Sequence, residues 1–110
     1  MFLIQAIVRP EKAPGVMSDL LDAGFPGMTK MEVFGRGKQR GIKIGDVRYD
    51  EIPKEMLMVA VEDENKDDVI RTILHSARTG ENGHFGDGRI FVIPVTASYT
   101  ISTGDMDRAV

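Results

Sequence analysis

A repeat with a constant offset of 53 positions runs through this 110-residue chain and limits the folds that it can adopt. Each copy contains a short apolar run followed by a stripe of apolar residues at helical spacing. The runs end at Val8 and Val61, and the stripes contain the pairs Val16 and Val69, Met17 and Ile70, Leu20 and Ile73, and Leu21 and Leu74. Because both copies repeat the same order of elements, the sequence predicts two β-α-β halves.

The repeat predicts an α+β fold of the ferredoxin-like, split β-α-β type (βαββαβ): a four-stranded antiparallel sheet with two helices on one face. Strands are expected at residues 2–8, 29–34, 56–61 and 89–95, and helices over the stripes that begin at Ala13 and Val69. Pro14 and Gly24 suit the start and the end of the first helix. Residues 36 to about 54 lack a clear period and are expected to form a long loop. Pro94 places the last strand at a sheet edge.

Length and composition bound the class of protein. The chain fits one domain, residues 1–110, and its 42% hydrophobic and 28% charged residues are typical of a soluble globular protein. A net charge of -3 provides no global cationic field for nucleic acid or an anionic membrane. The lack of cysteine excludes disulfides and thiolate metal sites. With neither a secretory signal nor a long apolar stretch, we expect a cytoplasmic protein without membrane insertion.

Two of the expected strands are apolar on both faces. The segments MLMVAV and IFVIPV carry apolar residues at consecutive positions, whereas two helices cover only one face of a sheet. Leaving the other face wet forfeits several kcal/mol at about 25 cal/mol per Å² of apolar area. We therefore expect self-association to cover it; the alternative is that the tail, residues 99–110, folds back over this face.

The chemistry of the chain lies in two glycine-rich stretches that carry cations, because no motif of a hydrolase, metalloprotease or P-loop protein occurs. Residues 35–41 combine three glycines with three cations, and residues 79–89 end in Arg89 directly before a strand. Glycine lets backbone N–H groups approach an anion, which the cations neutralise. The two stretches predict an anionic ligand in a cleft between subunits, and an interpretation as plain turns stays open from the residues alone.

Several blocks of residues match one family pattern in order and spacing. They are Gly27-Met28-Thr29, Gly35 to Gly41, Pro53-Lys54, Arg78-Thr79-Gly80, Gly86 to Val92 and Thr103-Gly104-Asp105. With these blocks the chain resembles the PII nitrogen-signalling proteins over nearly its whole length. The resemblance implies a homotrimer that is a sensor and not an enzyme, without a catalytic cofactor. Such proteins bind ATP or ADP in clefts between subunits and 2-oxoglutarate beside Mg-ATP, and a mobile T-loop then engages target proteins.

The resemblance also implies roles for individual residues. The implied nucleotide site consists of Thr29, Gly35, Gly37, Lys38, Gln39, Gly86, Asp87, Gly88 and Arg89. In it Thr29 approaches the adenine and the last four residues cradle the phosphates. The implied 2-oxoglutarate site consists of Gln39, Arg40, Gly41 and Lys54, with Gln39 also coordinating the Mg ion bound to ATP. The T-loop spans residues 36 to about 54, the B-loop about 79–89 and the C-terminal loop about 99–110.

Departures from the family pattern narrow the expected modification, ligand affinity and subgroup of this chain. The short T-loop places Tyr49 close to Lys54, which argues against uridylylation, and Thr100 and Ser102 replace two arginines, which predicts weakened nucleotide binding. A short T-loop with the opening GRGKQRG is most similar to the subgroup encoded with nitrogenase genes. This similarity implies nitrogenase as the target and a paired PII protein as a partner. The alternatives are control of glutamine synthetase or an ammonium transporter, or a trimeric metal-responsive protein of the same fold.

Overall fold

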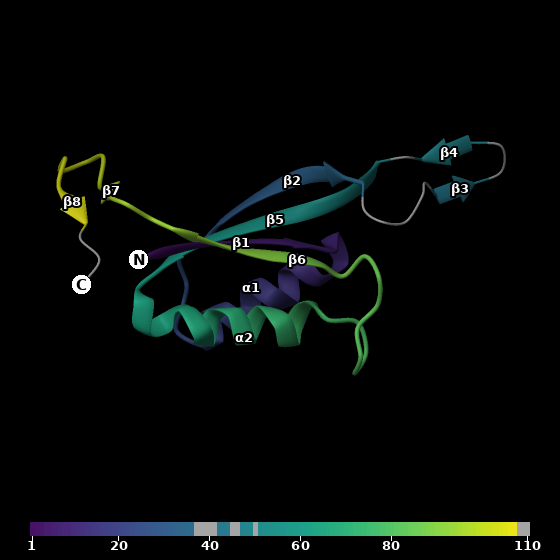
Figure 1. The fold of residues 1–110 in the computed structure, drawn as a ribbon, viewed down its shortest axis with the longest axis horizontal. Coiled ribbons are helices and arrows are strands. Elements are labelled where there is room, and N and C mark those ends of the chain that lie inside the picture. Colours follow the sequence, from purple (N-terminus) through teal and green to yellow (C-terminus); the bar gives the residue numbers. More distant parts are fainter. Residues whose placement is uncertain (37–41, 45–46, 50, 108–110) are drawn as a thin grey trace.

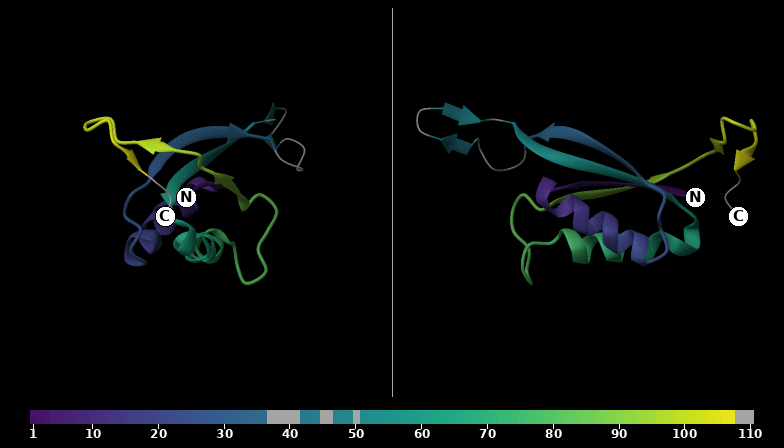
Figure 2. Two further views of the ribbon diagram at one scale, coloured as in Figure 1. Left: turned by 60° about the vertical axis from the view of Figure 1, so that its left-hand side comes forward. Right: turned by 180° about the vertical axis from the view of Figure 1, so that it is seen from behind.

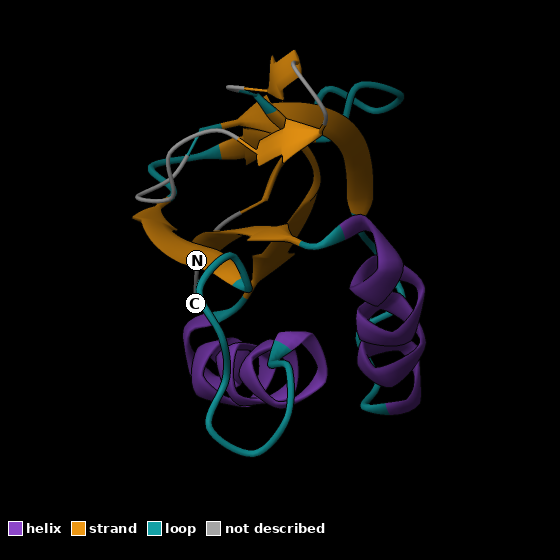
Figure 3. Cartoon of the chain, turned by 90° about the vertical axis from the view of Figure 1, so that its right-hand side faces the viewer, coloured by secondary structure: helices purple, strands orange, loops and turns teal. Residues whose placement is uncertain are grey.

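The computed structural model describes residues 1–36, 42–44, 47–49 and 51–107 and confirms the ferredoxin-like arrangement (Figure 1). Four strands form one antiparallel sheet in the order β2-β5-β1-β6, and both helices lie on one of its faces (Figure 3). The elements are β1 (Phe2–Val8), α1 (Ala13–Asp22), β2 (Thr29–Gly35), β5 (Ile52–Val61), α2 (Lys66–Ala77) and β6 (Gly88–Pro94), with single 3₁₀ turns, η1 (Pro10–Lys12) and η2 (Asp63–Asn65), before the helices. None of the helices in the described ranges is long and apolar enough to cross a membrane.

Strand β1 is the centre of the sheet. Its residue Val8 pairs with Glu55 of β5 on one side and with Gly88 of β6 on the other. Because both pairings are antiparallel, the end of β1 lies beside the starts of β5 and β6. Strand β6 is an edge strand, as predicted, and Pro94 stands at its last position, where a missing N–H costs the ladder least.

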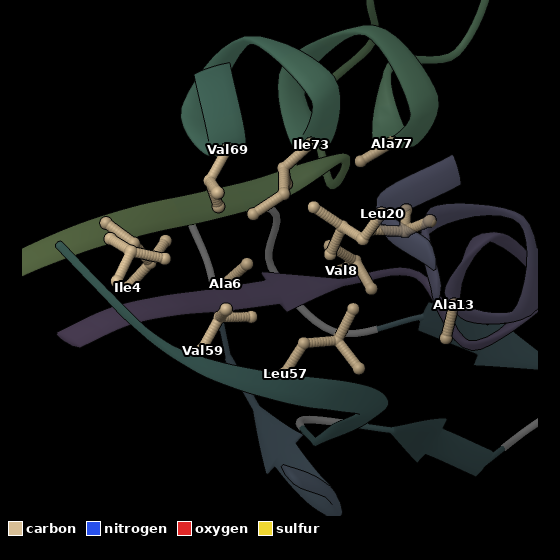
Figure 4. Packing of buried hydrophobic residues seen from close by; sticks show 12 residues of the cluster. Ile4, Ala6, Val8, Ala13, Leu20, Leu57, Val59, Val69, Ile73 and Ala77 are labelled. Carbon is tan, nitrogen blue, oxygen red and sulfur yellow. The ribbon is translucent and has the colours of Figure 1, made fainter. Parts of the chain in front are cut away.

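The core lies between the sheet and the helices. Alternate residues of β1 point toward the helices, where α1 and α2 each contribute a narrow buried stripe (Figure 4). The fully enclosed side chains include Ile4, Ala6, Val8, Val16, Leu20, Leu57, Val59, Val69 and Ile73. The prediction that the stripes are buried is wrong for two residues, because Leu21 is 58% exposed and Leu74 is 45% exposed. Each lies one residue, about 100° around the helix, beyond a buried position, so it turns away from the sheet.

The first helix ends as its sequence predicts. Gly24 adopts a φ of +96°, which glycine reaches without a steric penalty. Its N–H donates to the carbonyl of Leu21 at 3.0 Å, and the N–H of Phe25 donates to the carbonyl of Leu20 at 2.8 Å. These two bonds satisfy carbonyls that the helix end would otherwise leave unpaired.

The prediction of a long loop without secondary structure over residues 36 to about 54 is wrong in two respects. The segment contains a hairpin of two short strands, β3 (Ile42–Ile44) and β4 (Val47–Tyr49), which projects from one end of the molecule (Figure 2). In addition, β5 begins at Ile52 rather than at Met56. Its first four residues, IPKE, lack an apolar period, but they pair with β2, since Gly35 faces Ile52 and Val33 faces Lys54. Backbone hydrogen bonds to the neighbouring strand therefore extend β5 beyond its apolar run.

The described part of the tail, up to Asp107, does not cover the second face of the sheet. Its described part forms a two-stranded hairpin, β7 (Ser98–Tyr99) and β8 (Met106–Asp107), beyond the end of the sheet opposite to the β3–β4 hairpin (Figures 1 and 2). The alternative that this part of the tail folds back over the sheet is therefore wrong. On the face away from the helices, Met31, Phe91 and Ile93 keep between 39% and 44% of their surface exposed.

Candidate functional site

One end of the sheet gathers most of the predicted site residues that the structure describes. Gly88 and Arg89 begin β6 beside Val8 and Ile7 of β1, and Lys54 lies near the start of β5. The Lys54 ammonium donates to the carbonyl oxygen of Gly86, in the loop between α2 and β6. The structure thus brings a residue of the predicted 2-oxoglutarate site against the loop that is predicted to cradle phosphates.

One described residue of the predicted site, Thr29, does not join this cluster within one chain. Thr29 starts β2, six residues before Gly35, and a strand rises about 3.3 Å per residue, so about 20 Å separates the two positions. The remaining predicted residues lie outside the described residues: Gly37, Lys38, Gln39, Arg40 and Gly41.

Glycine is required at the junction of this loop with β6. Gly88 has a φ of +114°, and a Cβ atom there would lie 1.7 Å from the carbonyl oxygen of Ile7. Any side chain would therefore push β6 off β1 at the point where their pairing begins. At Gly86, with a φ of +90°, a Cβ atom would lie 3.2 Å from the Arg9 guanidinium. The glycines of this motif thus permit close packing as well as a tight turn.

The Asp87 carboxylate is the hydrogen-bond centre of the loop. It accepts bonds from the Thr79 amide at 3.0 Å, the Thr79 hydroxyl at 2.6 Å and the His84 amide at 2.9 Å. The Arg9 Nε–H donates a fourth bond at 3.0 Å. The Asp87 side chain is only 18% exposed. The carboxylate therefore holds both ends of the turn that runs from Thr79 to Asp87.

These donors set the charge state of Asp87. Burial alone would raise the pKa of this carboxyl group, since it disfavours the charged form. The bonds from Thr79, His84 and Arg9 outweigh burial, and the net result is a pKa well below the usual range. Asp87 is thus an anion throughout the physiological range.

Two cations, Arg9 directly after β1 and Lys54 on β5, bind the backbone of the same loop. Besides its bond to Asp87, Arg9 donates through Nη2 to the carbonyl of Phe85 at 2.7 Å, next to the carbonyl that Lys54 binds. Burial and then repulsion from Arg9 lower the pKa of the Lys54 ammonium, and Glu11 and Asp87 partly offset this. Sequence reasoning missed Arg9, because this residue lies outside both glycine-rich stretches.

The described residues also line open hollows on the surface, among them the following two. A cleft of about 400 Å³ lies between α2 and β6, and Arg78, Asp87 and Arg89 stand among its mostly apolar lining. A wider hollow of about 740 Å³ lies between the two helices, with Asp19 and His75 in its lining, and it does not include the loop. No group of three or more metal-binding side chains occurs in the part of the chain that the structure describes.

Comparison with known proteins gives a consistent result. Residues 1–105 match the family described as nitrogen regulatory protein P-II. The nitrogen fixation nifHD1 region GlnB-like protein 1 of Methanosarcina barkeri is 56% identical over 104 residues, which cover 94% of this chain and 96% of the relative. The corresponding nifHD region protein of Methanothermococcus thermolithotrophicus is 49% identical, over 96% of this chain and 97% of the relative. A nitrogen regulatory protein P-II 2 of Methanothermobacter thermautotrophicus is 44% identical, over 96% and 92% respectively.

The Asp87 network predicts a pH-dependent stability. The folded-state pKa lies below the unfolded value of about 3.9, so the contribution of Asp87 is present above that value and is lost as the pH falls through the folded pKa. In Asp87→Asn, we expect the free energy of unfolding at pH 7 to fall by about 1–3 kcal/mol. Urea unfolding at several pH values should show this difference shrinking below about pH 4.

Thr79→Val is the matched comparison, since it removes one of the four donors and keeps the backbone amide. We expect a smaller loss of stability in this variant. A difference between wild type and Asp87→Asn that stays constant down to pH 3 would contradict the assignment.

Proposed function

This chain belongs to the nitrogen regulatory protein P-II family, and from that premise we propose that it senses ATP or ADP together with 2-oxoglutarate and controls nitrogenase. Family membership makes it a regulator of nitrogen metabolism and not an enzyme. The observation that carries the proposed ligands is the contact between Lys54 and the loop at Gly86. It brings a cation suited to a carboxylate to a glycine-rich turn suited to phosphates.

The proposed nucleotide site combines the glycine-rich loop before β6 with the end of β2. In this proposal the loop from Gly86 to Arg89 surrounds the phosphates and the exposed Arg89 supplies a guanidinium to them, while the Asp87 carboxylate fixes the shape of the loop. Gly35 ends β2 close to the start of β5 and contributes the other wall. Lys38 and Gln39 belong to the proposal through the family pattern, and an amide oxygen such as that of Gln39 is a hard ligand of the kind that Mg²⁺ prefers.

The proposed carboxylate site lies next to the phosphates. Lys54 would bind one carboxylate of 2-oxoglutarate, and the segment from Gln39 to Gly41 would bind the other. Since the Lys54 ammonium holds the Gly86 carbonyl in this structure, 2-oxoglutarate has to take over or share that donor. The ligand then acts where β5 emerges from the segment that carries the β3–β4 hairpin. This position favours a ligand-dependent change in the T-loop.

The assembly that we propose is a homotrimer. The sheet face away from the helices is apolar and bare, with Met31, Phe91 and Ile93 exposed. Thr29 stands about 20 Å from Gly35 along β2, so it completes a nucleotide site only if it serves the site of a neighbouring subunit. A closed ring of chains meets both requirements, since each sheet face is covered and each Thr29 reaches a neighbour.

We expect sedimentation equilibrium to give three chains per particle. Phe91→Lys, which places a charge on the bare face, should shift the protein to smaller species, because burying an unpaired ammonium costs several kcal/mol. Leu21→Lys is the control, since Leu21 is 58% exposed on the helix layer and its variant should stay trimeric. A monomeric wild-type protein, or a trimeric Phe91→Lys, would contradict the proposed interface.

Calorimetric titration tests the ligands directly. We expect ATP to bind alone and 2-oxoglutarate to bind only when Mg-ATP is present. In Lys54→Ala, the affinity for 2-oxoglutarate should fall on the order of 10- to 100-fold, since a charge-assisted hydrogen bond is worth about 1.5–3 kcal/mol.

Lys30→Ala is the control, because it also removes a lysine from this sheet but not one that contacts the loop at Gly86. Lys30 lies on β2, and its ammonium is 4.0 Å from a Glu55 oxygen. Its 2-oxoglutarate affinity should match wild type. The ligand proposal fails if wild type binds neither compound, and the role of Lys54 fails if Lys54→Ala retains full affinity.

The proposed target rests on the relatives. Those with about half of their residues identical are named for the nitrogen fixation nifHD region. The chain shares their length, since it covers 96–97% of each of these two relatives. We therefore infer nitrogenase as the target, contacted through the T-loop and its β3–β4 hairpin, with a second PII protein as a partner. The proposed site of action is the cytoplasm.

An assay of purified nitrogenase tests the target. The protein, with and without a second PII protein, should inhibit acetylene reduction in the presence of Mg-ATP, and added 2-oxoglutarate should relieve the inhibition. A variant that lacks residues 42–49 should bind the ligands but fail to inhibit, because it lacks the proposed contact element. Undiminished nitrogenase activity together with inhibition of glutamine synthetase would contradict the proposed target and would indicate glutamine synthetase instead.

A further inference from the structure

Arg9 is held rigidly at the end of the central strand. It precedes Pro10, has an extended backbone with φ −62° and ψ 140°, and its carbonyl accepts bonds from the Lys12 and Ala13 amides at 3.0 and 3.2 Å. Its guanidinium therefore projects from a fixed point, and its side chain is 28% exposed. The backbone around Arg9 is thus ordered independently of the loop that the side chain contacts.

The guanidinium contacts that loop at two different kinds of acceptor. Nε donates to the Asp87 carboxylate at 3.0 Å, and Nη2 donates to the Phe85 carbonyl at 2.7 Å. A planar fork meets two acceptors in fixed directions at once, which the single ammonium of a lysine does not do. Arg9 thereby sets the positions of Phe85 and Asp87 relative to each other and to the end of β1.

We propose that Arg9 is a positioning residue for the nucleotide loop: through the Asp87 carboxylate and the Phe85 carbonyl it holds residues 84–88 in the shape that receives an anion. This inference rests on the proposed nucleotide site and adds a residue outside it. Arg9 acts through the loop, because both of its described bonds end on protein acceptors.

The loop needs such a device because of its composition. Gly83, Gly86 and Gly88 all adopt positive φ values, of 73°, 90° and 114°. Ordering a glycine-rich segment costs more conformational entropy than ordering other residues. If the loop is already ordered before a ligand arrives, that cost does not reduce the affinity. The guanidinium and the Asp87 carboxylate together supply this order in the ligand-free chain.

The test compares Arg9→Gln with Arg71→Gln. Arg71→Gln also removes a guanidinium that is bonded to an aspartate, since Arg71 donates to Asp68 at 2.7 Å. This pair, however, lies on the exposed side of α2. Hydrogen exchange without ligand should be faster at the Thr79 and His84 amides in Arg9→Gln and unchanged in Arg71→Gln. ATP affinity, titrated without 2-oxoglutarate, should fall on the order of tenfold in Arg9→Gln and match wild type in Arg71→Gln.

Two further variants separate positioning from direct contact and from general loss of stability. In a double-mutant cycle with Asp87→Asn, the losses of ATP affinity should be clearly less than additive, since both substitutions disrupt the same link. Arg9→Lys keeps the charge but not the fork, so we expect it to restore only part of the ATP affinity. Arg9→Lys also replaces Arg9→Gln in all measurements if urea unfolding shows that the latter does not fold.

Each arm has a result that overturns the inference. Unchanged exchange at Thr79 and His84, unchanged ATP affinity, or fully additive losses in the cycle would each contradict the positioning role. Full recovery in Arg9→Lys would indicate that charge alone matters. These outcomes differ from failure of the proposed function, in which wild type itself binds no nucleotide while the exchange difference between Arg9→Gln and wild type persists.

Discussion

The antiparallel pairing of β1 with both β5 and β6 is the constraint on which the site depends. Because β1 ends where its two partners begin, the residues after Val8, those before Met56 and those before Arg89 all meet at one end of the sheet. The pairing thus makes neighbours of segments that lie far apart in the chain. The requirement for a glycine at position 88, next to the Ile7 carbonyl, follows from the same pairing.

At this end of the sheet, two neighbouring cations, Arg9 and Lys54, face the carboxylates of Asp87 and Glu11. Burial and, second to it, repulsion from Arg9 lower the pKa of the Lys54 ammonium. Both cations stay because each has acceptors, namely the Phe85 and Gly86 carbonyls and the Asp87 carboxylate. A small anion entering here would find donors that are already oriented, which is the condition for tight binding of phosphate or carboxylate groups. In the proposed site, these two cations are thus already oriented before a ligand binds, at the expense of local repulsion.

Much of the fold was predictable from particular residues. The repeat at Val8 and Val61 identified the two halves, and Pro94 identified an edge strand, because hydrophobic period and proline chemistry are local properties. The start of β5 at Ile52 was not predictable, since its first residues have no apolar period and are held by β2. Leu21 was misplaced for a related reason: a stripe on a helix does not reveal how much of it the sheet covers.

The sequence alone determined the fold class, the glycine-rich loop and the family, because spacing, composition and motif order are written along the chain. Only the tertiary structure decided that the Asp87 carboxylate faces inward to four donors, and that Arg9, 78 positions away, supplies one of them. Hydrogen bonds between residues so distant have no periodic signature. They exist because β1 ends where β6 begins, at one end of the sheet, which is a property of the folded chain.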